Sequence, residues 1–227
     1  MTCRSAITSS SAQVRGSRQI RFFAHTQSRH TCGVTNQGRG PSAKVDQDRE
    51  LRADLRAAFR WRRDRTDDQG YADPTGWWAD PNILLRLGPA LATMFADAPP
   101  TVVLGLQSRG SLLGALVAVH LQVGLIEVRK EPQPSTDSDH WLIAHTPPDY
   151  RDRTLELGLR RAHVNVGDRA LLVDDWIDTG GQAVAARALI RAAEASWCGA
   201  AVIVDGLQDS RLRRDLRVRA LLHVRDL

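Results

Sequence analysis

One stretch of the sequence, residues 171–182, combines two adjacent carboxylates with a glycine-rich turn. An apolar run ends in Asp174 and Asp175, and Thr179 with two glycines follows before a helical pattern begins. Glycines let backbone N–H groups approach an anion closely, and the N-terminus of the next helix adds unpaired N–H groups and the positive end of its dipole. Adjacent carboxylates suit the hydroxyls of a sugar, or Mg²⁺ through its water ligands. The stretch therefore predicts a site for a sugar phosphate.

The order of these residues resembles the phosphoribosyl pyrophosphate (PRPP) motif of the type I phosphoribosyltransferases. In that family the acid pair binds the ribose hydroxyls, and the Thr-Gly-Gly loop holds the 5′-phosphate. The resemblance therefore assigns Asp174 and Asp175 to the ribose and, through water, to Mg²⁺ as the cofactor. It assigns the phosphate to the loop made by Asp178, Thr179, Gly180, Gly181 and Gln182.

Two further segments agree with this resemblance. An earlier apolar run ends in Ser108, Arg109 and Gly110, which is similar to the pyrophosphate loop of the family and above all to its form in adenine phosphoribosyltransferases. A guanidinium fork at Arg109 suits a pyrophosphate, and a glycine permits close backbone approach. A third apolar run ends in an Arg-Lys pair, and the resemblance implies that Lys130 also contacts pyrophosphate.

Two acids are candidates for proton transfer to or from the base. Asp178 stands just before Thr-Gly-Gly, where the hypoxanthine-guanine enzymes carry an acid of that role. The alternative for Asp178 is an acid that only favours the helix dipole. Asp149, followed by Tyr150, stands where adenine enzymes carry a Glu-Tyr pair on a flexible loop. The resemblance leaves the choice between Asp178 and Asp149 open.

Tryptophan is the candidate residue type for binding the base. Trp176 follows the acid pair, where the family places an apolar residue against the base, and an indole can stack on a purine. The alternative is that Trp176 fills the core. Base specificity in this family depends on a variable hood, for which Trp61, Trp77 and Trp78 are candidates by their proximity in sequence.

Short apolar runs alternate with helical patterns over the second half of the chain, which predicts an α/β fold with a mainly parallel sheet. We expect strands at 101–106, 126–129, 169–174 and 200–205, and helices at 111–121 and 182–195. Ligands of such sheets bind at the carboxyl ends of the strands, where the motifs lie. The resemblance implies a type I phosphoribosyltransferase-like fold, with a parallel central sheet flanked by helices and a small variable hood.

The regions around this alternation are expected as follows. Residues 46–60 show helical spacing, and a loop follows around Gly70 and Gly76. Asp80-Pro81 then starts a helix, which Pro89 is expected to kink or divide. A long polar segment at 131–153 predicts a lid loop. The arginine-rich run 211–219 predicts a solvated helix or a subunit contact.

The composition is that of a globular domain: 227 residues, 42% hydrophobic, 25% charged and 5% aromatic. It excludes collagen-like, disulfide-scaffold and wholly disordered proteins. No apolar stretch reaches the ~20 residues that a membrane span needs, so we expect no membrane partner. Three scattered cysteines without Cys-x-x-Cys spacing indicate a reducing compartment, and we expect a cytoplasmic protein.

The net charge of +5 is unevenly distributed. Residues 1–44 contain seven basic side chains and no acidic one, so the rest of the chain carries −2. A nucleic-acid-binding domain has its basic patch on the folded part, so nucleic acid is not expected as a partner. We interpret 1–44 as a disordered Ser/Arg-rich tail and 45–227 as the phosphoribosyltransferase domain. The tail can be an organellar transit peptide, a dispensable segment or the product of a start codon placed too far upstream. The chain has 29 arginines and 2 lysines, which indicates bacterial coding and disfavours the transit peptide.

The sequence thus predicts a Mg²⁺-dependent purine phosphoribosyltransferase that converts a nucleobase and PRPP to a nucleoside 5′-monophosphate and pyrophosphate. Adenine is the expected base, and we expect a homodimer. Two alternatives stay open at this point. One is a PRPP-sensing regulator with little catalysis, because a fold and a site do not guarantee turnover. The other is a phosphoribosyltransferase for a base that is not a purine.

Overall fold

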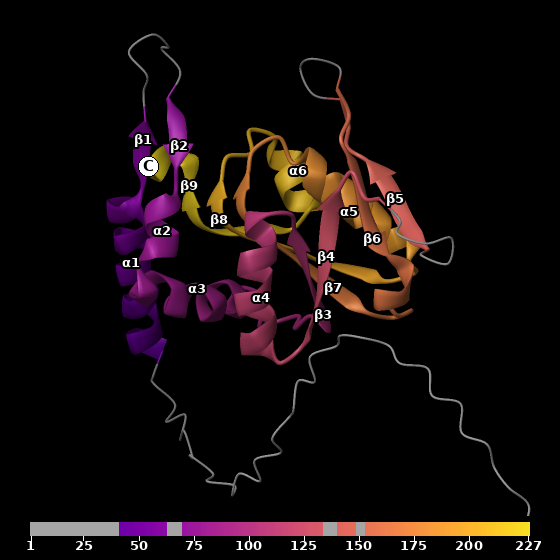
Figure 1. Ribbon diagram of the computed structural model, residues 1–227. Coiled ribbons are helices and arrows are strands. Elements are labelled where there is room, and N and C mark those ends of the chain that lie inside the picture. The colour runs from indigo at the N-terminus through magenta and orange to yellow at the C-terminus, as the bar shows by residue number, and fades with distance from the viewer. Residues whose placement is uncertain (1–40, 63–69, 134–139, 149–152) are drawn as a thin grey trace, which may run out of the picture. The chain divides into compact units, whose positions relative to one another are not determined.

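The computed structural model describes residues 41–62, 70–133, 140–148 and 153–227 (Figure 1). The strands are β1 (Arg60–Arg62), β2 (Tyr71–Asp73), β3 (Val102–Leu106), β4 (Gly124–Lys130), β5 (Trp141–His145), β6 (Glu156–Arg160), β7 (Arg169–Ile177), β8 (Ser196–Asp205) and β9 (Val218–His223). The helices are α1 (Pro41–Ala58), α2 (Thr75–Ala79), α3 (Pro81–Thr93), α4 (Arg109–Leu121), α5 (Gly181–Ala192) and α6 (Ser210–Asp215), with the 3₁₀ turns η1 (Arg161–His163) and η2 (Val224–Asp226).

The centre of the fold is a seven-stranded sheet with the order β5-β6-β4-β3-β7-β8-β9. The strands from β4 to β9 in this order are parallel, whereas β6 and β5 continue the sheet antiparallel. The α/β class and its mainly parallel sheet are therefore as expected. All four strands and both helices expected in the second half are present, with ends that differ by a few residues.

Helices cover both faces of the sheet because successive side chains of each buried strand point to opposite sides. Val103 and Leu171 face a core that includes residues of α1, α2, α3 and α4. Leu104 and Leu172 face a second core, which includes residues of α5 and the end of α6. This layering brings the loops after β3, β4 and β7 to one edge of the sheet.

The helix after Asp80 begins as predicted, and it is not divided. The Asp80 carboxylate accepts hydrogen bonds from the N–H groups of Asn82 (2.8 Å) and Ile83 (3.4 Å). The expected division at Pro89 is wrong, because α3 continues to Thr93. Proline removes one backbone donor, but the buried face of α3 packs into the core and holds the helix together.

Two segments expected to be loops contain strands. The region around Gly70 contains β2, which pairs with β1 as a separate hairpin, and α2 follows. The expected lid segment contains β5, which pairs with β6; residues 134–139 and 149–152 within it lie outside the described residues. The strands of the hairpin have three residues each and are mostly exposed, so they show no alternation of apolar and polar residues.

The arginine-rich run 211–219 is divided between two elements, so the expectation of one solvated helix is wrong. Helix α6 ends at Asp215, and Arg219 lies in the edge strand β9. The Arg219 guanidinium pairs with Asp97 at 2.7 Å and lies 4.5 Å from the centre of the Phe95 ring.

No helix of the described residues is long and apolar enough to cross a membrane.

Candidate active site

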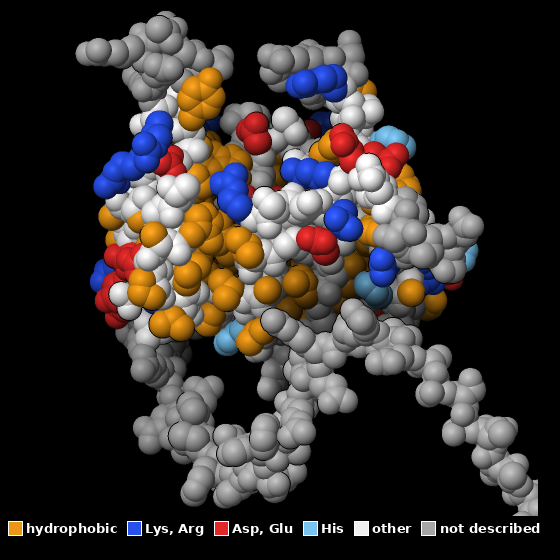
Figure 2. Space-filling view, in the orientation of Figure 1, with side chains coloured by type: hydrophobic (Ala, Val, Ile, Leu, Met, Phe, Trp, Pro, Cys, Tyr) orange, Lys and Arg blue, Asp and Glu red, His pale blue; other side chains and the backbone are white. Residues whose placement is uncertain are grey.

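A pocket of about 650 Å³ opens at the carboxyl ends of the central strands, as expected for ligand sites in open α/β sheets. It is lined by Ser108, Arg109, Lys130, Asp174, Asp175, Trp176, Asp178, Thr179, Gly180, Gly181 and Gln182, together with further residues named below. Of the expected site residues, Gly110 does not line the pocket, and Asp149 lies outside the described residues. Figure 2 shows basic side chains around a hollow between the β1–β2 hairpin and β4, and mainly hydrophobic ones over α3 and α4.

The turn from β7 to α5 is shaped to receive an anion. Gly180 has φ = 77°, a left-handed conformation that favours glycine, and the N-terminus of α5 begins at the next residue. Helix α5 has no side-chain cap at this end, so the N–H groups of its first turn are available to a ligand. Thr179 Oγ1 accepts a long hydrogen bond from the Gly181 N–H at 3.4 Å. This turn therefore has the form of a phosphate-binding helix N-terminus.

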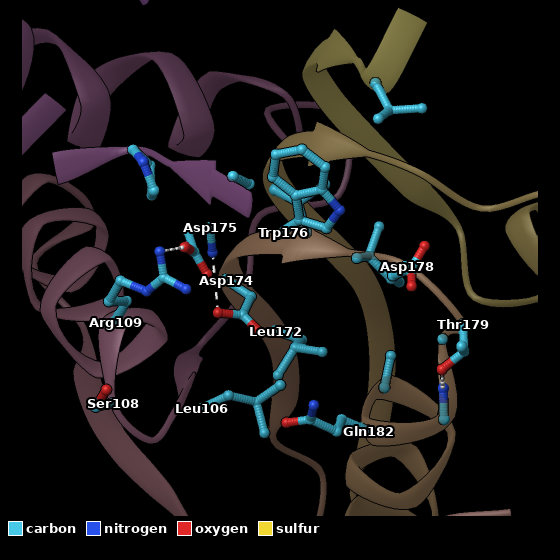
Figure 3. A pocket seen from close by; sticks show the side chains of 18 of the residues that line it. Leu106, Ser108, Arg109, Leu172, Asp174, Asp175, Trp176, Asp178, Thr179 and Gln182 are labelled. Atoms are coloured by element: carbon cyan, nitrogen blue, oxygen red, sulfur yellow. Dashed lines mark hydrogen bonds and ion pairs between the residues drawn. The ribbon is translucent and has the colours of Figure 1, made fainter. Parts of the chain in front are cut away.

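The turn from β3 to α4 holds a second group of polar residues next to the first. Ser108 and Arg109 are exposed at the N-terminus of α4, and Arg109 points toward Asp175 (Figure 3). The Gln107 side-chain oxygen accepts a hydrogen bond from the Lys130 N–H at 3.1 Å, and the Gln107 N–H donates to the Val128 carbonyl at 3.0 Å. Gln107 thus links the β3–α4 turn to the end of β4, where Lys130 lies.

Gly110 has a steric role beneath the pocket. A Cβ at this position would lie 2.8 Å from Asp174 Oδ1 and 2.9 Å from the Val173 carbonyl oxygen. Real Cβ atoms do not approach oxygen atoms so closely. A glycine at 110 therefore lets the first turn of α4 pack against β7 at the acid pair, which differs from the expected approach of its backbone to a pyrophosphate.

The acid pair carries the strongest electrostatic perturbation of the site. Asp175 is buried, and its Oδ2 lies 2.8 Å from Arg109 Nη1. Asp174 Oδ1 accepts a hydrogen bond from the Asp175 N–H at 2.9 Å. Burial and the neighbouring Asp175 charge raise the pKa of Asp174, while the Asp175 N–H and the Lys130 charge oppose that rise. Burial therefore favours the neutral form of Asp174, and a cation bound at the pair would favour its ionised form.

Aromatic side chains form one wall of the pocket. Trp176 at the end of β7 and Trp61 from the hairpin both line it, with ring centres 6.4 Å apart at an interplanar angle of 83°. The Phe59 ring packs against both, with its centre 5.2 Å from the Trp61 ring centre and 6.2 Å from that of Trp176. Trp176 thus both packs against the core and faces the pocket, and its contact with a base stays a prediction. Trp77 is fully buried and donates its indole N–H to the Leu55 carbonyl at 2.8 Å, so its expected place in the hood is wrong.

Comparison with known proteins identifies the family. No family model matches the chain. Over 137 residues it is 38% identical to the adenine phosphoribosyltransferase of Streptomyces galbus, a match that covers 60% of this chain and 71% of that enzyme. The chain belongs to the adenine phosphoribosyltransferase family. The resemblance seen in the sequence motifs is therefore confirmed.

Solved structures of adenine phosphoribosyltransferases agree with the fold. The enzyme from Rhodothermus marinus is 29% identical, with a TM-score of 0.67, and the match covers 78% of this chain and 99% of that one. The Saccharomyces cerevisiae enzyme, solved with an imino-altritol bisphosphate and adenine, is 24% identical with a TM-score of 0.66, and the match covers 77% and 99%. At that identity the second comparison supports the fold alone. The type I phosphoribosyltransferase fold expected from the sequence is confirmed.

Several residues of this adenine phosphoribosyltransferase homologue that line or brace the pocket were not singled out from the sequence. They are Gln107, Tyr71 of the hairpin and Val224 of η2. Gln107 directly precedes the Ser-Arg-Gly turn, so its position next to Ser108 could have indicated a place at the pocket. Tyr71 and Val224 reach the pocket only through the hairpin and the C-terminal turn, and no local pattern in the sequence marks them.

The acid pair fits Mg²⁺ as the family implies. Mg²⁺ is usually bound in such sites by one or two carboxylates together with phosphate and water oxygens. Asp175 Oδ2 is buried without an aligned hydrogen bond, so it retains capacity to accept. Within the described part of the chain no cluster of three or more His, Cys, Asp or Glu residues could hold a metal. The free acceptor on the buried acid pair is the feature that fits the ion.

Asp178 lies on a different side of Trp176 from the acid pair (Figure 3). Its side chain is exposed. A Cβ on Gly206 would lie 3.2 Å from Trp176 Nε1 and 3.4 Å from Asp178 Oδ1, so both polar groups come close to that glycine. The Asp178 carboxylate is therefore placed near the indole of the aromatic wall.

Proposed function

We propose that this protein is an adenine phosphoribosyltransferase, which transfers the ribosyl 5-phosphate of PRPP to adenine and releases pyrophosphate. A bond forms between a ring nitrogen of adenine and the anomeric carbon of PRPP, and the bond from that carbon to pyrophosphate breaks. Family membership supports the reaction, and the curated relative carries the name of this enzyme.

One observation carries the proposal: the turns after β3, β4 and β7 meet around a single pocket, which the Gly180 turn, the acid pair and the aromatic wall all line. We assign the 5′-phosphate to residues 178–182 and the ribose hydroxyls to Asp174 and Asp175. Arg109 and Lys130 would bind the leaving pyrophosphate, with Ser108 beside them. The base would lie against Trp176, because the aromatic wall adjoins the acid pair.

The chain's own residues would act by positioning and by charge stabilisation. Arg109 offers a fork of donors where negative charge develops on the leaving group. Asp178 is our first candidate for moving the proton of the base, because it is exposed beside Trp176. Asp149 stays a candidate from the sequence. Mg²⁺ held by Asp174 and Asp175 would neutralise pyrophosphate charge.

The experiment measures pyrophosphate release from PRPP and Mg²⁺ with adenine, hypoxanthine, guanine, xanthine, uracil and orotate. We expect adenine to give the highest kcat/KM, and the Asp174→Ala/Asp175→Ala variant to lose the activity. Release with another base and not with adenine would overturn the assignment of the base. The absence of release with every base, despite PRPP binding, would overturn the enzyme assignment. The homodimer and the cytoplasmic location stay predictions.

A further inference from the structure

The loop after β8 lies directly against the proposed phosphate loop. A Cβ on Gly180 would lie 2.9 Å from Leu212 Cδ2 and 3.1 Å from Leu207 Cδ2. Leu207 follows β8, and Leu212 belongs to α6. The two leucines therefore form a wall behind Gly180, and their position limits where the turn at Gly180 can lie.

Arg213 holds this wall to the end of the sheet. Its Nε lies 2.5 Å from Asp205 Oδ2, and its Nη2 donates a hydrogen bond to the Leu207 carbonyl. Asp205 Oδ1 also accepts from the Leu207 N–H at 2.9 Å. Asp205 is buried at the end of β8 and is paired in register with Ile177, the last residue of β7. The phosphate loop begins immediately after Ile177, so Arg213 connects the wall to the strand that carries the loop.

A second ion pair fixes the other end of α6. Arg187 lies on α5, the helix that begins in the phosphate loop. Its Nη1 is 2.8 Å from Asp215 Oδ2 and donates to the Asp215 carbonyl at 3.0 Å. Helix α6 is thus attached to both elements that flank the phosphate loop, to β7 through Asp205 and to α5 through Arg187.

We infer that Arg213 is a positioning residue that holds the 178–182 loop ready for the 5′-phosphate of PRPP through Leu207 and Leu212. This inference rests on the proposed function. Arg213 does not line the pocket, so it acts through the leucine wall. Arginine is required because its planar fork reaches the Asp205 carboxylate and the Leu207 carbonyl together, whereas a lysine ammonium is a single point donor.

The test compares Arg213→Lys with the matched variant Arg214→Lys. Arg214 is exposed on the same helix and forms no hydrogen bond or ion pair through its side chain with the described residues. Arg213→Lys keeps a positive charge beside buried Asp205, so we expect it to fold. Calorimetry with ribose 5-phosphate measures the affinity of the phosphate loop, steady-state kinetics give the KM values for PRPP and adenine, and thermal unfolding gives Tm.

We expect Arg213→Lys to bind ribose 5-phosphate about tenfold more weakly and to raise the KM for PRPP similarly, because preorganisation of the loop is lost. The KM for adenine should stay within about twofold, and Arg214→Lys should match the wild type. Leu212→Ala, which removes part of the wall itself, should show the same loss of ribose 5-phosphate affinity.

The outcomes separate the inference from the proposed function. A lower Tm of Arg213→Lys with an unchanged ribose 5-phosphate affinity would show a merely structural role and overturn the inference. A wild-type protein that binds ribose 5-phosphate but turns over no base would contradict the proposed function. The inference would still be decided by the ratio of the ribose 5-phosphate dissociation constants of Arg213→Lys and the wild type. A wild-type protein that does not bind ribose 5-phosphate would overturn the inference itself.

Discussion

Charges of opposite sign meet in the ligand-free pocket before any substrate binds. Arg109 pairs with Asp175, and Lys130 acts electrostatically on Asp174. PRPP brings negative charge of its own, and in the proposed complex the pyrophosphate would take the place of Asp175 beside the Arg109 guanidinium. Ionisation of Asp174 in this buried place therefore makes the protein less stable than a neutral side chain there would.

Replacement of Asp174 by Asn should stabilise the ligand-free protein and inactivate it. Burial and Asp175 raise the pKa of Asp174, so the folded state favours the protonated acid while the unfolded state has it ionised at neutral pH. Stability of the wild type therefore falls as the pH rises above the unfolded pKa, and Asn removes that loss. We expect Tm to rise by roughly 3 °C at pH 8 and by less at pH 5, measured without Mg²⁺ or phosphate. A lower Tm for Asp174→Asn at pH 8 would contradict this account.

Gly110→Ala and Gly124→Ala form a matched pair of glycine substitutions near the same sheet. A Cβ at 110 meets Asp174 Oδ1 and the Val173 carbonyl, whereas a Cβ at 124 has nothing within 4 Å. Gly110→Ala should cost about 1–3 kcal/mol of unfolding free energy, as overpacking does. It should also lower kcat/KM, because α4 moves away from the acid pair. Chemical denaturation measures the first effect, and equal stability of the two variants would show that the close approach at Gly110 is not needed.

At the scale of elements, the β1–β2 hairpin supplies the side chains that line the pocket beside Trp176. Arg62 pairs with Asp73 across the hairpin, and Asp73 also accepts hydrogen bonds from Thr75. These bonds hold the pKa of Asp73 at about 2, so the pair persists at neutral pH. The hairpin brings Trp61 and Tyr71 to the pocket mouth. We propose that this hairpin is the expected hood.

Trp61→Ala should therefore weaken binding of the base and leave that of PRPP nearly unchanged. We expect the KM for adenine to rise about tenfold, since loss of an aromatic contact costs about 0.5–1.5 kcal/mol beyond the lost buried area. Trp61→Phe should keep most of the affinity. Initial-rate kinetics with each substrate varied in turn provide the measurement. Equal increases in both KM values would instead indicate a general disturbance of the pocket.

The sequence predicted the elements whose signal is local and missed those that depend on distant contacts. The acid pair and the Thr-Gly-Gly turn are contiguous with β7 and α5, so their residue types and order were sufficient. Trp176 and Trp61 were singled out separately, but their packing into one wall was not predictable, because Trp61 reaches Trp176 only through the hairpin. Trp77 was misplaced for the same reason, since its burial depends on α1. Strand β5 was missed because a polar, proline-rich surrounding hides five residues that pair with β6.

At the scale of the whole molecule, the pocket draws its described lining from Trp61 to Val224, and α1 supports it from the core. Leu51 and Leu55 are almost completely buried, and the Leu55 carbonyl accepts the Trp77 indole N–H. Removal of α1 should therefore destabilise the core, whereas removal of residues 1–40 leaves α1 in place.

Deletion of residues 1–40 should leave kcat and both KM values within about twofold of the wild type, because α1 and every described pocket residue are retained. Deletion of residues 1–58 should prevent folding. It removes two buried leucines worth about 2–3 kcal/mol each and leaves the Trp77 N–H unpaired, against a total stability of about 5–15 kcal/mol. Circular dichroism and turnover of the two truncated proteins provide the comparison. A stable, active protein lacking 1–58 would contradict the role given to α1.

We propose that one pocket holds the 5′-phosphate, the ribose and the base at the end of β7, with the pyrophosphate at the ends of β3 and β4. A crystal structure of the protein with AMP bound tests this most directly. The account predicts the phosphate at the 178–182 turn, the ribose hydroxyls at Asp174 and Asp175, and the adenine ring against Trp176. A phosphate bound away from Thr179 and Gly180, or an adenine ring that does not contact Trp176, would contradict it.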